Sequence, residues 1–224
     1  MAGHSLGEYT ALVAAGAIDF SAAVSLVAQR GEMMQAATPP GTGAMAAVLG
    51  LDDEVLAGVC EQAAEDLVVS CANFNSPGQI VIAGNREAVD RACVLATEAG
   101  ARRAIPLAVS VPSHCALMAP AAEGMATVLE SVEISTSGIP VLHNVDTEAR
   151  DNADDIRSAL VQQLSQPVRW AATVAKLAES GALSMAECGP GKVLTGLNRR
   201  ISREITSSAL ISIDAIEQTL ENWS

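Results

Sequence analysis

The residues best suited to chemistry stand at the start of the chain, in the pattern Gly3-x-Ser5-x-Gly7. This is the spacing of a nucleophile elbow, a tight strand-to-helix turn that presents a serine hydroxyl at its apex. Because a Cβ at either glycine would collide across such a turn, we expect both positions to require glycine. A helix predicted over residues 6–15 would point its free N–H groups at the serine. We therefore predict Ser5 as a nucleophile and the N–H of Leu6 as an oxyanion donor.

A serine nucleophile needs a base, and the chain has three histidines. His4 is too close to Ser5 along the chain to reach its hydroxyl, so we expect it in a supporting position. His143 lies inside a strand expected over residues 140–145 and reads as a structural residue. His114 stands at a loop-to-helix junction where a predicted insertion rejoins its parent domain, and such junctions favour binding clefts. His114 is therefore our candidate general base.

Arg30 is the candidate for binding an anionic substrate. It lies on a helix predicted over residues 22–37, on a face shared with apolar residues at helical spacing, which are Leu26, Val27, Met33 and Met34. One interpretation is an arginine that snorkels from the edge of the helix, with its head group in water. The other is a cation held inside a cleft, where its planar fork would bind a substrate carboxylate.

The elements that must position these residues indicate an α/β protein with an inserted unit. A Pro- and Gly-rich run at residues 39–43 marks the boundary. After it we expect strands at 44–50, 68–73, 79–83 and 102–109 and helices at 53–65 and 86–99. The order β-α-β-β-α-β is typical of a ferredoxin-like unit. We therefore assign residues 1–40 and 110–224 to the core and residues 41–109 to the inserted subdomain.

The second half of the core continues the alternation of helices and strands. We expect helices at 116–131, 154–164, 168–180 and 193–203 and at the end of the chain, and strands at 140–145, 184–188 and 209–214. No internal repeat or low-complexity tail interrupts this pattern.

Composition limits the classes of function. Half of the 224 residues are hydrophobic and 17% are charged, which suits a packed core, and the formal net charge of −13 argues against nucleic acid as a partner. No apolar run reaches membrane-spanning length and no signal segment begins the chain, so we expect a cytoplasmic protein. Five cysteines lack metal-ligand spacing, so we expect reduced thiols and no metal site; they are Cys60, Cys71, Cys93, Cys115 and Cys188.

The motifs taken together resemble those of the malonyl-CoA:acyl carrier protein transacylases, the discrete acyltransferases of bacterial fatty acid synthesis. The matching stretches are G-H-S-L-G-E-Y at 3–9, Q-R-G at 29–31, N-F-N-S-P-G-Q at 73–79, V-P-S-H at 111–114, Gln163 with Q-P-V-R-W at 166–170, and E-C-G-P-G-K-V-L at 187–194. They occur in the family's order and span the chain. The resemblance implies an α/β-hydrolase-like acyltransferase core that carries a ferredoxin-like (α+β) subdomain.

The resemblance also assigns roles to individual residues. It implies that Ser5 is acylated, that His114 is the base and that Arg30 binds the substrate carboxylate. Gln163 would lie beside the base, where a backbone carbonyl orients His114 in place of an acidic third member, and Asn73 would contribute to substrate binding.

The implied reaction transfers a malonyl group from malonyl-CoA to the phosphopantetheine thiol of acyl carrier protein, with a malonyl-serine intermediate and no bound cofactor. The implied protein is a monomer. We expect acyl carrier protein to dock on the helix after residues 189–191, because basic residues gather there in an otherwise acidic chain: Lys192, Arg199, Arg200 and Arg203. The alternative for this group is a solvated basic helix face.

The sequence departs from the family at its start. Family members begin upstream with a Gly-Gln-Gly segment that supplies a second oxyanion-hole N–H, and this sequence begins at the elbow. We therefore expect a truncated chain or a wrongly assigned start, with the strand before the elbow and one oxyanion donor lacking. Loss of one such donor costs roughly 2.7–4 kcal/mol of transition-state stabilisation.

Three alternatives remain open at this point. An esterase or thioesterase of the α/β-hydrolase type would need an Asp or Glu between the serine and the histidine, and would not need Arg30 on an inward face. An inactive fragment would only bind partners. An acyltransferase domain cut from a multidomain synthase is the third, although the chain ends directly after its last expected helix, without a linker, which favours a freestanding protein.

Overall fold

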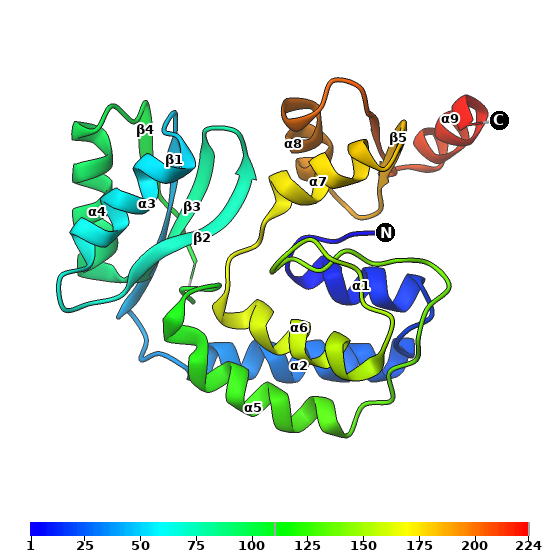
Figure 1. Cartoon of the computed structure of the whole chain (residues 1–224), viewed down its shortest axis with the longest axis horizontal. Coiled ribbons are helices and arrows are strands. Elements are labelled where there is room, and N and C mark those ends of the chain that lie inside the picture. Colours follow the sequence, from blue (N-terminus) through cyan, green and yellow to red (C-terminus); the bar gives the residue numbers. More distant parts are fainter. Residues whose placement is uncertain (110, 224) are drawn as a thin grey trace.

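Four helices enclose the main apolar core in the computed structural model of the chain, which describes residues 1–109 and 111–223. They are α1 (Leu6–Ala14), α2 (Phe20–Ala36), α5 (Ala119–Glu130) and α6 (Ala153–Ser165), and they lie close together on one side of the molecule (Figure 1). Their inward faces are aliphatic, as the helical spacing of Leu and Met predicts; Leu12, Leu26, Met125 and Leu160 are all buried between them. A short 3₁₀ turn, η1 (Ala116–Met118), precedes α5.

The second unit is a four-stranded sheet with two helices on one face (Figure 1). Its elements are β1 (Gly43–Leu49), α3 (Asp53–Ala64), β2 (Val69–Ser76), β3 (Gln79–Asn85), α4 (Arg86–Glu98) and β4 (Arg103–Pro106). The strands lie in the order β2-β3-β1-β4, and every neighbouring pair is antiparallel. The predicted order of elements is confirmed. Gly78, with a φ of 67°, closes the tight turn between β2 and β3.

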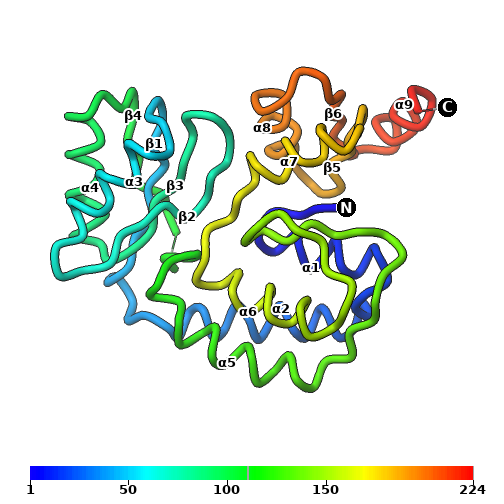
Figure 2. The backbone as a smooth tube through the Cα atoms, viewed as in Figure 1, coloured from blue at the N-terminus to red at the C-terminus, as the bar shows by residue number. Residues whose placement is uncertain are grey.

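Two connections join the sheet to the helices, and they run side by side (Figure 2). The first enters β1 at Gly43 and the second passes through Pro112, which lies so close that a Cβ on Gly43 would be 2.4 Å from its ring. Glycine at this position therefore lets the two connections approach each other. Residue 110, the predicted first residue of the returning core, lies outside the described residues.

The C-terminal part packs above the helical layer (Figure 1). It contains α7 (Trp170–Glu179), β5 (Ser184–Glu187), α8 (Val193–Ile201), β6 (Thr206–Ala209) and α9 (Ile213–Trp223). β5 and β6 form a parallel pair, and a small apolar core beneath them includes Val168, Trp170 and Leu197.

Two predicted strands were wrong. Residues 140–145 form only isolated bridges, from Leu142 to Ala2 and to Ala149. A ladder cannot continue there because Pro140 has no N–H and the N–H of Asn144 donates to the Glu8 side chain instead. Of residues 209–214, only Ala209 lies in a strand, as the last residue of β6.

That second error has a separate cause. β6 ends at Ala209 because its partner β5 ends at Glu187. Beyond it, Ser212 accepts the N–H groups of Ala215 and Ile216 and so begins α9. The described residues as a whole form a mixed α/β protein. Within that part of the chain, none of the helices combines the length and the apolarity needed to cross a bilayer.

Candidate active site

Ser5 sits at the turn into α1 with φ 51° and ψ −107°, outside the conformations that an L-residue normally adopts. Close packing on the N-terminal side of Ser5 maintains this strained conformation. A Cβ on Gly3 would lie 1.9 Å from the carbonyl oxygen of Gly7. Gly3 is therefore required, as predicted. The same prediction was wrong for Gly7, whose Cβ would meet nothing within 4 Å because this residue lies inside α1 and faces open space.

Asn144 clamps the strained turn from the opposite side. Its Oδ1 accepts the N–H of Ser5 at 2.7 Å, and its Nδ2 donates to the carbonyl oxygen of Gly3 at 2.7 Å. The side chain is fully buried, so both bonds lie away from competing water. The sequence analysis missed this residue, because nothing in its local pattern relates it to the elbow.

His114 and Ser5 form a hydrogen-bonded pair. The Nε2 of His114 lies 2.8 Å from the Oγ of Ser5, and its Nδ1 lies 2.7 Å from the carbonyl oxygen of Gln163. Because a carbonyl can only accept, Nδ1 carries the proton, and Nε2 of the neutral ring is free to accept the serine proton. Burial, with a smaller contribution from the nearby charge of Arg30, lowers the pKa of His114 to about 4. His114 is therefore an unprotonated base at neutral pH.

Helix α6 fixes the position of this base. The N–H of His114 donates to the carbonyl oxygen of Leu164 at 3.1 Å, and the ring is held by the carbonyl of the preceding residue, Gln163. His114 itself has a φ of 63°, which turns the chain sharply before η1. The last turn of one helix thus orients both the backbone and the side chain of the base.

Arg30 points from α2 toward the same hydroxyl. Its Nη2 donates to the Oγ of Ser5 at 3.1 Å and to the Oε1 of Gln163 at 3.0 Å, and its guanidinium lies 5.6 Å from the ring centre of Tyr9. The residue is only 6% exposed, so the interpretation as a snorkelling arginine is wrong. Its Nε has no hydrogen-bond partner, and among the described residues no carboxylate pairs with it. A buried, unpaired cation is costly unless an anion joins it.

Leu6 supplies the N–H that the sequence predicted for an oxyanion. It is the first residue of α1, directly after Ser5, and its N–H has no acceptor in residues 1–109 and 111–223. The partial positive charge at the N-terminus of α1 adds to the same position. A negative oxygen that develops beside Ser5 would therefore meet a free donor.

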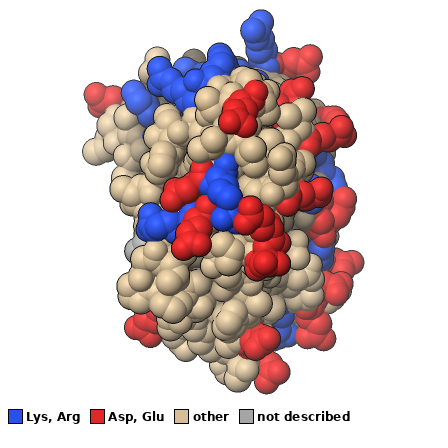
Figure 3. Space-filling view, turned by 90° about the vertical axis from the view of Figure 1, so that its left-hand side faces the viewer, with Lys and Arg blue, Asp and Glu red and all other residues tan. Residues whose placement is uncertain are grey.

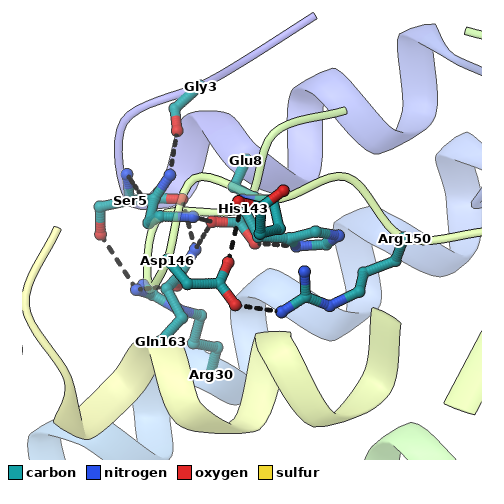
Figure 4. A network of polar contacts seen from close by, with 10 residues as sticks. Gly3, Ser5, Glu8, Arg30, His143, Asp146, Arg150 and Gln163 are labelled. Carbon is teal, nitrogen blue, oxygen red and sulfur yellow. Dashed lines mark hydrogen bonds and ion pairs between the residues drawn. The ribbon is translucent and has the colours of Figure 1, made fainter. Parts of the chain in front are cut away.

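Glu8 is a second residue of the site that sequence reasoning overlooked. It is fully buried, and its two oxygens contact three different donors from distant parts of the chain (Figure 4). Oε1 lies 2.7 Å from the Nδ1 of His143, and Oε2 accepts the N–H of Asn144 and the Nε2 of Gln163, each at 2.9 Å. One signal was available: an acidic side chain one turn after Ser5, on a helix that has no other charged residue.

The remaining histidines and Asn73 form no hydrogen bond to the Ser5 hydroxyl within the described part of the chain. His4 bonds through Nε2 to the Oδ1 of Asn75 at 2.8 Å, and its ring lies 5.8 Å from that of Trp170. His143 is buried against Glu8. Asn73 is buried on β2 beside an irregularity in the pairing with β3, and no hydrogen bond joins its side chain to Ser5 or His114. Its predicted contribution to substrate binding stays a prediction.

The predicted docking residues lie on and beside α8. Lys192 precedes the helix and Arg203 follows it, while Arg199 donates to the carbonyl oxygen of Ser207 at 3.3 Å. Arg200 donates to the Oε1 of Gln79 at 2.6 Å and so reaches across to the four-stranded sheet.

Two further arginines, which the sequence analysis did not single out, join Arg200. Arg102 and Arg103, at the start of β4, line a cavity of about 580 Å³ together with Arg200. Seen from the side of the sheet, Lys and Arg side chains gather at the upper end of the molecule, where acidic residues are fewer (Figure 3). This end can attract an acidic partner in a chain whose net charge is −13.

A strained serine at the head of a helix, bonded to a neutral histidine and beside a free N–H, defines an enzyme that forms an acyl-serine. The acyl transferase domain model matches residues 1–213, and the chain belongs to this acyltransferase family.

Known relatives agree with that membership. The chain is 57% identical over 223 residues to the malonyl CoA-acyl carrier protein transacylase of Haemophilus influenzae, covering 98% of this chain and 72% of the relative. The relative of the same name from Bacillus subtilis is 46% identical, and the match covers 98% of this chain and 70% of the relative.

An acyl carrier protein S-malonyltransferase from Vibrio cholerae has a similar structure, with a TM-score of 0.96 at 52% identity. The match covers 97% of this chain and 71% of that chain. A malonyl-transacylase solved with its type II polyketide synthase acyl carrier protein gives a TM-score of 0.98 at 53% identity. This match covers 99% of this chain and 72% of that chain.

Proposed function

We propose that this chain transfers a malonyl group from malonyl-CoA to the phosphopantetheine thiol of acyl carrier protein, a step of fatty acid biosynthesis. One observation carries the proposal beyond family membership. The buried guanidinium of Arg30 lies 3.1 Å from the Oγ of Ser5 and has no carboxylate partner among the described residues. An acyl group that carries its own carboxylate would pair with this guanidinium while its carbonyl carbon lies at the serine.

The first half-reaction acylates Ser5. His114 accepts the hydroxyl proton at Nε2 as the Oγ of Ser5 attacks the thioester carbonyl carbon. The negative oxygen of the tetrahedral intermediate lies near the N–H of Leu6. The carbon–sulfur bond then breaks, and His114 gives its proton to the departing thiolate of coenzyme A. A malonyl ester remains on Ser5.

The second half-reaction reverses these steps with a different thiol. The phosphopantetheine thiol of the carrier protein gives its proton to His114 and attacks the ester carbonyl. The ester bond to the Oγ of Ser5 breaks, and His114 returns the proton to that oxygen. In both half-reactions the Nδ1–H of His114 donates a hydrogen bond to the carbonyl oxygen of Gln163, so the ring keeps the same tautomer.

The mechanism uses no acidic third member beside the histidine. A carbonyl group that accepts the Nδ1 proton orients the ring without adding a negative charge. A second carboxylate at this place would repel the carboxylate of the substrate, whereas the neutral carbonyl does not. This arrangement suits a substrate that is itself an anion.

The proposal extends to the architecture and the partners. Residues 1–40 and 110–224 would form the α/β-hydrolase-like core and residues 41–109 the ferredoxin-like subdomain, which the sheet order β2-β3-β1-β4 with two helices on one face supports. We place the docking site for the acidic face of the carrier protein at the basic end of the molecule, around Arg200 and the cavity that it lines. The reaction would take place in the cytoplasm, in a monomer with no bound cofactor.

The direct test is transfer of radiolabelled malonyl from malonyl-CoA to phosphopantetheinylated acyl carrier protein, with the Ser5→Ala variant as the matched control. We expect labelled carrier protein from the unaltered chain and none from the variant. Release of free malonate at the same rate without the carrier protein would instead support a thioesterase. Absence of both products from a folded chain would contradict the proposal.

A further inference from the structure

The strongest polar group that the proposed reaction leaves unused is the buried carboxyl group of Glu8, one turn along α1 from Ser5. We infer that Glu8 is a positioning residue that sets the orientation of the Gln163 amide, and through it the Arg30 guanidinium, for acyl groups that carry a carboxylate. This inference deepens the proposed function and rests on it.

The hydrogen bonds of Glu8 define which of its oxygens can carry a proton. Oε2 accepts two N–H groups, from Asn144 and from the side chain of Gln163, so it carries none. Oε1 faces the Nδ1 of His143 at 2.7 Å. Both oxygens are therefore occupied inside the protein, where an unsatisfied carboxyl oxygen would be strongly destabilising. Glu8 makes no contact with the Oγ of Ser5, so it does not act on the reacting atoms.

The contact with Gln163 decides which end of that amide faces Arg30. The Nε2 of Gln163 donates to Glu8 at 2.9 Å and to the carbonyl oxygen of Ser5 at 3.0 Å. Two acceptors on this side fix the NH₂ group there, so the Oε1 must face the opposite way and accept from Arg30 at 3.0 Å. Without Glu8 only the carbonyl oxygen of Ser5 holds the NH₂ group, so a half-turn that places this group against the guanidinium becomes less costly.

Arg30 depends on this acceptor because it has few others. Among the described residues its guanidinium bonds to the Oγ of Ser5 and the Oε1 of Gln163, and its Nε bonds to nothing. A guanidinium held at one corner by Gln163 keeps its remaining N–H groups directed into the site, where a carboxylate can bind. Disorder at that corner would weaken carboxylate binding more than it weakens the chemistry at Ser5.

A second branch of the network leads to the elbow. Glu8 accepts the N–H of Asn144, whose side chain accepts the N–H of Ser5. Loss of this branch would slow every acyl group alike, since all of them use the same serine. The ratio of malonyl to acetyl transfer therefore isolates the branch through Gln163 from general damage.

The test compares this ratio of kcat/KM values in the unaltered full chain and in four variants. Glu8→Ala should lower the preference for malonyl at least tenfold. Glu8→Gln should stay within threefold of the unaltered chain. Its amide oxygen can accept both N–H groups, and its NH₂ group can donate to the unprotonated Nδ1 of the other His143 tautomer. Glu8 and Gln163 replaced together by alanine should give the same ratio as Gln163→Ala alone, because one residue acts through the other.

The control is Leu12→Ala, the next buried residue on the same face of α1, which loses packing but no polar contact. It should lower the melting temperature and leave the malonyl preference within threefold. An unchanged preference in Glu8→Ala, or additive losses in the double variant, would overturn the inference and leave Glu8 a structural residue.

A second measurement separates failure of this inference from failure of the proposed function. The side-chain NH₂ resonances of Gln163, assigned by their loss in Gln163→Ala, report the amide without any substrate. Their exchange with water should be slow in the unaltered chain and in Glu8→Gln, and fast in Glu8→Ala. If the unaltered chain does not transfer malonyl but this pattern holds, only the proposed function fails. If exchange stays slow in Glu8→Ala, the inference fails whatever the reaction.

Discussion

The Nη2 of Arg30 lies 3.1 Å from the Oγ of Ser5, although Arg30 lies on α2 and Ser5 precedes α1. A cation at this distance repels a proton from the neighbouring histidine. This effect favours the state in which His114 is neutral and can accept the proton of the Ser5 hydroxyl as that oxygen attacks. The same cation can bind a carboxylate that arrives with the acyl group, so one guanidinium faces both the Ser5–His114 pair and the substrate.

Ser5 should carry the acyl group. After a brief incubation with radiolabelled malonyl-CoA in the absence of carrier protein, proteolysis should yield a labelled peptide that contains Ser5. The Ser5→Ala variant should acquire no label, because the hydroxyl that forms the ester is gone. Label on another peptide, or label that survives in Ser5→Ala, would contradict the assignment.

The reactivity of Ser5 should persist to unusually low pH. Burial lowers the pKa of His114 from its ordinary value of 6.5 to about 4, so the ring stays an active base until the pH approaches that value. The rate at which phenylmethylsulfonyl fluoride labels Ser5 should therefore fall with a midpoint near pH 4, because this reagent has no titrating group of its own. A loss of reactivity with its midpoint at pH 6.5, the ordinary pKa of histidine, would contradict this prediction.

His114→Ala supplies the control for this profile. It should lower the rate at neutral pH by roughly 10²–10⁴-fold, the usual range for a general base, and remove the midpoint.

The pKa of His114 also affects the stability of the fold. The pKa of His114 is lower in the folded state than its ordinary value of 6.5. The stability that neutral His114 gives the folded state is therefore fully present above about pH 6.5 and is lost as the pH falls toward 4. Circular dichroism at each pH must therefore show that the chain is still folded.

The two glycines of the elbow should respond in opposite directions to the same substitution. Gly3→Ala places a Cβ 1.9 Å from a backbone oxygen, so we expect the turn to shift, activity to fall and the free energy of unfolding to drop by at least about 1–3 kcal/mol. Gly7→Ala meets open space inside a helix and should stabilise the chain by about 0.5–1 kcal/mol. Urea unfolding of both variants checks this. Equal losses would mean that Gly7 also has a packing role.

Charge reversal on α8 should affect the carrier protein and spare coenzyme A. In Arg199→Glu and Arg200→Glu, we expect the apparent KM for acyl carrier protein to rise several-fold, because complementary charges speed the encounter of two proteins. The KM for malonyl-CoA should not change. Arg91→Glu on α4 is the control for charge alone and should affect neither value. Equal rises in both KM values would indicate that these arginines bind phosphate groups instead.

Much of the fold could be predicted because its signals are local. The Pro- and Gly-rich run at residues 39–43 marks where the inserted unit begins, and the elements of the four-stranded sheet follow it in the predicted order. The two strands that were wrong fail for non-local reasons. The N–H of Asn144 is taken by Glu8, 136 positions away, and the partner of β6 ends before the apolar run at 209–214 does.

The site divides in the same way. Ser5, Leu6 and Gly3 could be predicted because the elbow is a local motif, and His114 because of its place after the insertion. The sequence left two interpretations of Arg30 open, since helical spacing shows which face a residue shares but not how deeply it is buried. Asn144 could not be found at all, because its contact with Ser5 joins residues 139 positions apart.

Arg30→Ala is the sharpest test of substrate choice. The guanidinium is 6% exposed and is unpaired with any carboxylate of the described residues, so it offers its full charge to a substrate. A malonyl group brings a planar carboxylate that fits the guanidinium fork, whereas an acetyl group ends in a methyl and would leave the cation unpaired. Removal of one partner of such a pair typically costs about 2–5 kcal/mol.

We therefore expect Arg30→Ala to depress malonyl transfer strongly and to leave acetyl transfer unchanged or raised. The preference for malonyl should shrink at least tenfold, which corresponds to about 1.4 kcal/mol. Arg30→Lys is the matched control: it keeps the charge but lacks the fork, so it should retain only part of the preference. The measurement is kcat/KM for malonyl-CoA and acetyl-CoA with the same carrier protein. If both acyl groups lose activity in parallel, Arg30 supports the nucleophile alone and the carboxylate is recognised elsewhere.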